Sequence, residues 1–187
     1  MGERGTSTDT KMRIVKSLQA MMEQQPLEKI KVSALCKNAG VSRTTFYEYF
    51  RDVFDVPTWL WDYFMSQSLY QMGITMSCYD AHVKNFHFLK DNQAFFELAF
   101  KSNHYNSVFL HGARVVKEHI IATASKNAGR ELNEQELRDI EFRNAGAAHM
   151  TKLWARGGMK EPPEVMANLF QSFTPQFLVD FLEVAMG

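Results

Sequence analysis

The chain has 187 residues, enough to bury the core of one or two domains. Its 45% hydrophobic and 22% charged residues are ordinary for a soluble globular protein. No apolar run approaches the ~20 residues of a membrane span. The polar start MGERGTSTDTK lacks the apolar core of a signal peptide. These features exclude a membrane-spanning class, and we expect a cytoplasmic protein.

The charges are balanced over the whole chain but unevenly distributed along it. Residues 1–51 contain nine lysines and arginines against five aspartates and glutamates, so the remainder is acidic overall. A basic first quarter on an acidic body favours contact between the N-terminal region and a polyanion. A small imbalance also arises by chance, so this signal only supports others.

Apolar residues recur at helical spacing along nearly the whole chain, and no strand pattern occurs. Three short helices come first, and the residues expected to begin or end them are Asp9 or Thr10, Gln24-Gln25-Pro26, Ser33, Gly40 and Ser42. The third helix is predicted over residues 43–50. A fourth is expected to start at Asp52 or Asp55, with Pro57 in its first turn, and to run to the mid-seventies.

Longer helices follow, with breaks at polar, glycine and proline residues. They are predicted around residues 80–90, 93–100, 106–127, 133–156 and from Pro162 or Pro163 to Leu182. We therefore predict an all-α protein of about nine helices. A three-helix unit is expected over residues 1–52 and a helical domain over residues 53–187, with the fourth helix shared between them.

The stretch VSALCKNAGVSRTTFYEYF, residues 32–50, predicts two helices that meet at a Gly-Val-Ser corner. This is the pattern of a helix-turn-helix unit, whose second helix enters the DNA major groove. Val41, Phe46 and Phe50 would form its apolar anchoring face. The opposite face carries hydroxyls and Arg43, which can bond guanine bidentately. An ordinary polar surface helix would carry a similar face, but the corner favours DNA binding.

At this point the sequence resembles a known family. KIKVSALCKNAGVSRTTFYEYFRD, within residues 10–56, is similar to the DNA-binding domain of the TetR family of bacterial regulators, and LWARGGMKEPPEVMANL resembles the last inter-helix turn of many members. The resemblance implies that Arg43, Thr44, Tyr47 and Tyr49 face DNA. It implies phosphate contacts from Ser33, Lys37, Ser42 and Thr45. Glu48 is expected to point away from DNA.

The sequence departs from the family at Val53, where many members carry a lysine that touches the DNA backbone. We expect Arg51 to take over that phosphate contact. The resemblance also implies a homodimer through the last two helices, which would read a palindromic operator in double-stranded DNA. The small residues of NAGAAHM and the wide apolar arc of the final helix are compatible with such a dimer.

The family further implies a ligand pocket in the helices after residue 55. Most phenylalanines at helical spacing belong to the core, so only a subset of the aromatic residues is expected to line this pocket. The candidates are Trp59, Trp61, Phe64, Phe88, Phe96, Tyr105, Phe109, Met150 and Trp154.

No residue pattern points to catalysis, a metal or a cofactor. Cys36 and Cys78 form no CxxC pair and are expected to be buried apolar residues. His111 and His119 are two helical turns apart, too far for one metal ion, and no P-loop or nucleophile elbow occurs. We expect no catalytic residues.

The sequence thus predicts a dimeric transcriptional regulator, a repressor released from DNA by a small, largely apolar ligand. One alternative is a co-regulator of the same fold that binds a protein partner instead of a metabolite. Another is a helical-bundle enzyme, which would need an acid/base or metal cluster. A specific footprint on a palindrome would favour the regulator over both.

Overall fold

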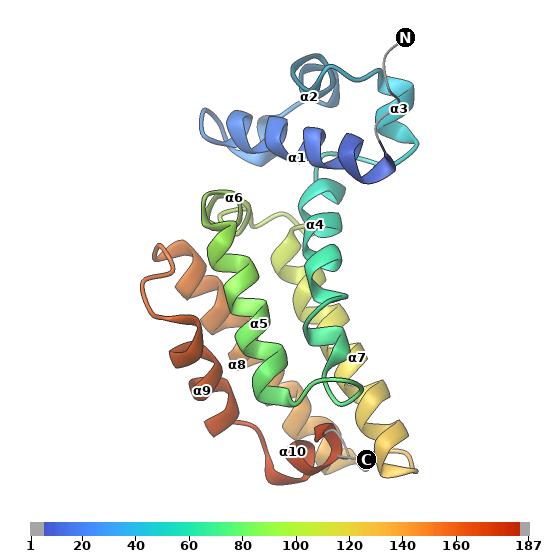
Figure 1. Ribbon diagram of the computed structural model, residues 1–187, viewed down its shortest axis with the longest axis vertical. Helices are drawn as coiled ribbons and strands as arrows, with labels where there is room; N and C mark the ends of the chain where they lie inside the picture. Colours follow the sequence, from blue (N-terminus) through green and yellow to red (C-terminus); the bar gives the residue numbers. More distant parts are fainter. Residues whose placement is uncertain (1–5, 184–187) are drawn as a thin grey trace.

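The computed structural model describes residues 6–183, and every regular element of that part is helical (Figure 1). Its α-helices are α1 (Ser7–Met22), α2 (Val32–Ala39), α3 (Arg43–Tyr47), α4 (Asp55–Met65), α5 (Cys78–Asp91), α6 (Gln93–Ala99), α7 (Val108–Ala128), α8 (Glu134–Arg156), α9 (Pro163–Ser172) and α10 (Gln176–Leu182). Two single 3-10 turns are η1 (Leu27–Lys29) and η2 (Leu69–Gln71). The predicted all-α fold class is confirmed.

Helices α1 to α3 lie together at one end of the molecule, and α4 leads from them into a bundle of longer helices (Figure 1). In the bundle α5 packs along α9, and α7 packs along α8. Helix α10 covers the far end against α7, while α6 lies beneath α1. Helix α4 contacts α1, α5 and α7, so it is shared between the two groups of helices, as expected.

Local capping explains most helix boundaries. Thr6 and Asp9 form a reciprocal capping box, so α1 begins earlier than the predicted start at Asp9 or Thr10. Asn133 begins α8 with a second capping box, as predicted. Gly40 ends α2 in the left-handed conformation, with φ of 63°. The prediction for Ser33 was wrong: it lies inside α2, which begins after Lys31.

Three predicted helices are shorter than expected. Helix α3, predicted over residues 43–50, ends at Tyr47. Helix α4 ends at Met65, not in the mid-seventies, because the Ser66 and Ser68 hydroxyls donate to backbone carbonyls of the preceding turn. The predicted final helix is split into α9 and α10 at Pro175. Proline has no backbone N–H and disfavours a helical residue before it, so the chain turns there.

The side chains that fix α3 come from aromatic residues on its inner face. Phe46 is fully buried and Phe50 almost so, with their ring centroids 5.5 Å apart. Burial of one such ring contributes about 1.5–3 kcal/mol, which is large for a five-residue helix that could not form alone. Helix α3 is therefore held by packing, in which α2 is its neighbour.

Helix α4 approaches α7 unusually closely. The buried Trp61 ring lies over Gly112, and a Cβ atom added at Gly112 would lie 2.9 Å from two ring carbons. Only glycine, which has no Cβ atom, permits this contact inside a helix. The distance between α4 and α7 is therefore set by one indole ring.

A buried polar cluster joins α5, α8 and the turn before α10. Arg143, 7% exposed, donates to Nε2 of His82 at 3.1 Å and to Oγ1 of Thr174 at 3.3 Å. Because arginine only donates, His82 Nε2 accepts and Nδ1 donates to the Cys78 carbonyl at 2.7 Å. Among residues 6–183, no carboxylate pairs with Arg143. Cys36 and Cys78 are both buried, as predicted.

This cluster predicts an acid-sensitive fold. Burial first, and then the Arg143 charge, lower the pKa of His82 from 6.5 to about 3. The unfolded chain therefore binds a proton that the folded chain excludes. The contribution of His82 to the free energy of unfolding should therefore be fully present above pH 6.5. It should fall as the pH decreases from there towards 3, by up to about 1.4 kcal/mol per pH unit.

Urea unfolding between pH 7 and 5, above the range in which carboxylates titrate, measures this slope. His82→Gln should remove most of it. His119→Gln, at a half-buried histidine whose pKa burial also lowers, should remove a smaller part. An unchanged slope in His82→Gln would contradict the assignment.

Candidate nucleic-acid interface and interior cavity

The corner between α2 and α3 is formed by local interactions that the sequence contains in full. Gly40 turns the chain, and the Val41 amide bonds back to the Cys36 carbonyl. Ser42 then caps α3 by accepting a hydrogen bond from the Thr45 amide at 2.9 Å. The result is two short helices joined by a tight turn, which is the geometry of a helix-turn-helix unit.

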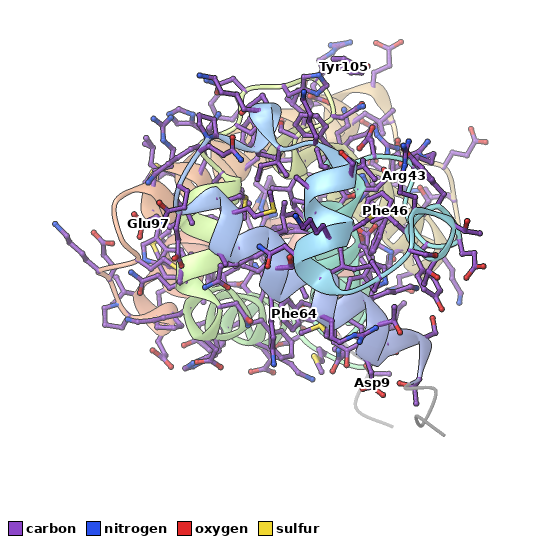
Figure 2. All side chains as sticks on the ribbon, turned by 90° about the horizontal axis from the view of Figure 1, so that it is seen from above. Asp9, Arg43, Phe46, Phe64, Glu97 and Tyr105 are labelled. Atoms are coloured by element: carbon purple, nitrogen blue, oxygen red, sulfur yellow. The ribbon has the colours of Figure 1, made fainter. Side chains whose placement is uncertain are left out.

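One face of α3 is left to solvent. Arg43, Thr44 and Tyr47 are exposed, while Phe46 is buried. Figure 2 labels Arg43 and Phe46 on this helix. The Arg43 guanidinium carbon lies 5.9 Å from the centre of the Tyr47 ring, so the two side chains share this face. The face therefore offers a guanidinium and hydroxyls at the helix N-terminus, where base edges are read in this motif.

The expected phosphate ligands fall into two groups. Ser33 and Lys37 are exposed on α2 and have no side-chain hydrogen bond within residues 6–183. The Ser42 and Thr45 hydroxyls are 2.9 Å apart and bond to each other beside the cap of α3. If these two hydroxyls contact a phosphate, they must do so while they also take part in the cap of α3.

The residues after α3 are held by contacts with α1 and with the start of α4. Tyr49 is half-buried, and the Lys11 amine lies 5.2 Å from the centre of its ring. Arg51 forms a bidentate pair with Asp55, with both N–O distances at 2.9 Å. Val53 is buried, which explains the absence of a lysine there. A phosphate at Arg51 would compete with Asp55. Partial burial raises the pKa of Asp55, but its hydrogen bonds with Arg51 outweigh this effect, so the pKa is lowered overall.

Two contacts link helices α1 to α3 to the loop between α6 and α7. The Ser102 hydroxyl donates to the Glu28 carboxylate beyond α1. The His104 ring stacks on Phe54, just before α4, with centroids 4.1 Å apart and planes within 8°. A movement of this loop or of α4 would therefore displace α3.

The interior of the bundle contains a small cavity of about 40 Å³. Its walls come from α4, α5, α7 and α8, with Phe170 from α9. Most of the wall is apolar, including Trp61, and the polar residues on it are His82, Asn85, Asn144 and Thr151. It lies against the contact between Trp61 and Gly112.

The nine predicted pocket residues do not share one site. Trp61 and Phe109 line the interior cavity. Trp59 and Tyr105 line a polar groove of about 490 Å³ on the surface beside Arg51. The others lie elsewhere: Phe64 and Phe88 stack on each other, Phe96 and Trp154 are buried in the core, and Met150 lines a groove between α8 and α9.

Sequence reasoning missed the polar residues of the cavity wall. Cys78, His82 and Asn85 recur at helical spacing on the buried face of α5, among Ala81 and Phe86. Polar residues on an otherwise apolar helical face were the available signal, because such residues must find partners when buried.

Helices α8 and α9 expose an apolar surface. Phe142 is 84% exposed and Phe173 72%, and both border a groove of about 290 Å³ with Met150 and Leu169. Gly146, Ala147 and Arg143 also line this groove. Exposed aromatic rings around a groove are typical of an interface with another surface.

Within residues 6–183, no three histidine, cysteine, aspartate or glutamate side chains are placed to hold a metal ion. No helix of this part is long and apolar enough to cross a bilayer.

Three solved structures share the fold over nearly the whole chain. DhaS, a dihydroxyacetone kinase operon activator, is 18% identical and aligns over 92% of this chain and 96% of its own, with a TM-score of 0.56. AlkX from Dietzia sp. strain DQ12-45-1b is a TetR family repressor implicated in n-alkane biodegradation. It is 13% identical and aligns over 91% of this chain and 98% of its own, with a TM-score of 0.52. The fatty acid degradation regulator FadR from Bacillus halodurans is 15% identical and aligns over 95% of this chain and 97% of its own, with a TM-score of 0.51.

At these identities the likeness concerns the fold alone. No curated protein matches the sequence. A TetR family model described as a transcriptional regulator C-terminal region matches residues 77–176, which is more than half of the chain. The match lies outside the helix-turn-helix stretch, so it is independent of the motif found in the sequence. The chain belongs to the TetR family of transcriptional regulators.

Proposed function

We propose that residues 1–52 bind double-stranded DNA through the outer face of α3, and that residues 53–187 bind a ligand and a second copy of the chain. The observation that carries this proposal is the exposed set Arg43, Thr44 and Tyr47 on a helix anchored by buried Phe46. Arg43 and Thr44 read bases, while Lys37 and Ser33 contact phosphates. Family membership supports the same assignment.

The ligand site is the interior cavity between α4 and α7. A ligand there contacts Trp61 on α4, and α4 continues from the helix-turn-helix unit through Phe54. Binding moves α4, which changes the spacing of the two recognition helices in a dimer and releases DNA. By linkage, DNA and ligand must weaken each other's binding by the same factor. The mostly apolar wall supports a largely apolar ligand.

We propose repression as the direction of control. Proteins of this fold include one named as an activator and one named as a repressor, so the fold is compatible with both. Repression follows if the ligand-free arrangement is the one that fits the operator. The contacts of Glu28 with Ser102 and of Phe54 with His104 would hold that arrangement until α4 moves.

A second candidate function is that of a co-regulator controlled by a protein partner. The size of the cavity favours it, because about 40 Å³ is far below the ~300–1,000 Å³ typical of small-molecule sites. A stoichiometric partner bound at the body, with DNA release on its binding, would support this candidate.

The DNA proposal predicts a sharp effect of one arginine. In fluorescence anisotropy with the duplex upstream of the gene, Arg43→Ala should weaken specific binding about 5- to 150-fold, through loss of a bidentate base contact. The matched control is Arg156→Ala, an exposed arginine at the end of α8. It should leave the affinity unchanged. Wild-type binding should also weaken steeply with salt.

If the upstream duplex is not bound, a genome-wide selection of bound fragments supplies the operator for the same comparison. Equal binding by Arg43→Ala and wild type on a specific site would contradict the role given to α3. Circular dichroism of the variants separates loss of contact from loss of fold.

The dimer proposal predicts that a single exposed ring controls assembly. Phe142→Asp should convert a dimer of 21.6 kDa chains into monomers in sedimentation velocity, because it places a charge in the apolar groove of the partner. The protomer fold should survive, since Phe142 is 84% exposed. Tyr105→Asp, at a ring that is 76% exposed and lies outside α8 and α9, should remain dimeric. A dimeric Phe142→Asp variant would place the interface elsewhere.

A further inference from the structure

The buried guanidinium of Arg143 uses only one of its two hydrogen-bonding edges. Nε donates to Oγ1 of Thr174 at 3.3 Å, and Nη2 donates to Nε2 of His82 at 3.1 Å. These two nitrogens form the side edge of the planar fork. Within residues 6–183, Nη1 makes no hydrogen bond. The end edge, formed by Nη1 and the second N–H of Nη2, is therefore left without an acceptor.

This free edge also lacks a counter-charge. Arg143 is 7% exposed, and no carboxylate in the described part of the chain pairs with it. Such a charge is costly, because the guanidinium has lost most of its water without gaining an anion. Nη1 has no partner within residues 6–183 and yet is not fully enclosed. An anion from outside can therefore reach this edge.

The groove of about 290 Å³ between α8 and α9 lies beside the guanidinium, and Arg143 helps to line it. The guanidinium carbon is 6.0 Å from the centre of the Phe170 ring, which lines the same groove. Thr174, which accepts from Nε, directly follows Phe173 at the border of the groove. These contacts place the guanidinium between α8 and the residues that end α9.

The rest of the groove is apolar. Apart from Arg143, its lining side chains are phenylalanine, leucine, methionine and alanine, together with one glycine. None of them carries a hydrogen-bond donor. The volume is close to the ~300 Å³ at the lower end of small-molecule sites, whereas the interior cavity has only about 40 Å³. The groove thus combines one cationic donor pair with space for a hydrocarbon chain.

These features restrict the chemistry of an occupant. A carboxylate presents two coplanar oxygens, which match the two parallel N–H groups of a guanidinium edge. A phosphate would bring further charged oxygens, for which the groove has no donor. An alcohol would leave the charge of Arg143 unpaired, and an ammonium group would be repelled by it.

We propose that the groove between α8 and α9 binds an aliphatic carboxylate. Its head group accepts two hydrogen bonds from the free edge of Arg143, and its hydrocarbon chain lies against Phe142, Phe170 and Phe173. This site is distinct from the interior cavity, and its assignment does not rest on a ligand in that cavity.

The same groove is the surface proposed above for the dimer. A bound chain and a second copy of the protein therefore exclude each other, so the carboxylate favours the monomer. A monomer binds a palindromic operator more weakly, because its two recognition helices are no longer linked. This consequence rests on the proposed dimer, whereas the binding of the carboxylate does not.

The first test compares probes of the same chain length that differ in head group: octanoate, octan-1-ol, octylammonium and octyl phosphate. Isothermal titration calorimetry at pH 7 uses the full-length protein without DNA. Octanoate should bind about tenfold more tightly than octan-1-ol, because hydrogen bonds to a charged group are the stronger ones. Octyl phosphate should bind more weakly than octanoate, and octylammonium should not bind. Acetate should bind at least about 100-fold more weakly than octanoate, because it buries no chain.

Variants at two positions then locate the site. Gly146→Leu should weaken octanoate binding about tenfold or more, because a Cβ atom added at Gly146 meets nothing within 4 Å and the longer side chain fills the groove. Gly146→Ala is the matched control and should bind octanoate like the wild type. Arg143→Gln should abolish the preference for octanoate over octan-1-ol. Arg138→Gln, at an exposed arginine of α8, should preserve it.

If Arg143→Gln does not fold, the head-group comparison and Gly146→Leu still decide. No binding of octanoate, equal binding of octan-1-ol, tighter binding of octyl phosphate, or octanoate binding that survives Gly146→Leu would overturn the proposal. Sedimentation velocity separates the site from the proposed dimer. Octanoate should convert dimers into monomers, and octylammonium should not. Gly146-dependent octanoate binding with an unchanged dimer would leave the site standing and place the dimer interface elsewhere.

Discussion

The arrangement of this protein depends on the close contact between Trp61 and Gly112. A side chain at position 112 would clash with the indole ring, so α4 can approach α7 only because that position is a glycine. The same ring forms part of the cavity wall and lies on the helix that carries the DNA-binding unit. A displacement of the ring by less than an ångström would also displace α4, because protein interiors are densely packed.

The body is held by more than apolar packing. Arg143 is buried without a carboxylate in the described part of the chain, and its charge is balanced only by the acceptors His82 and Thr174 and by the Phe170 ring, 6.0 Å away. A buried charge without a counter-ion is costly unless its hydrogen bonds are well placed. Arg143 also lines the groove between α8 and α9, so a second chain covering that groove would complete its surroundings.

The helix-turn-helix unit is joined to the body by packing of α1 against α4 and α6 and by individual side-chain contacts. A hydroxyl-carboxylate bond joins Ser102 to Glu28, and a ring stack joins His104 to Phe54 at the start of α4. Within the body, Asp62 on α4 accepts from His111 on α7. Single contacts of this kind contribute about 0.5–1.5 kcal/mol each, so a ligand of modest affinity is sufficient to rearrange them. Such coupling suits a regulator that must change the position of α3 without unfolding.

The sequence by itself determined the all-helical class and the helix-turn-helix unit. Gly40, Ser42 and the spacing of Phe46 and Phe50 act over a few residues, so the local sequence is sufficient to predict their effects. The tertiary structure alone decided which rings line the cavity, where Arg143 is buried, and that Trp61 and Asn85 face one space. Helical periodicity shows that a face is buried but not which helix covers it, because that choice depends on side-chain shapes from distant parts of the chain.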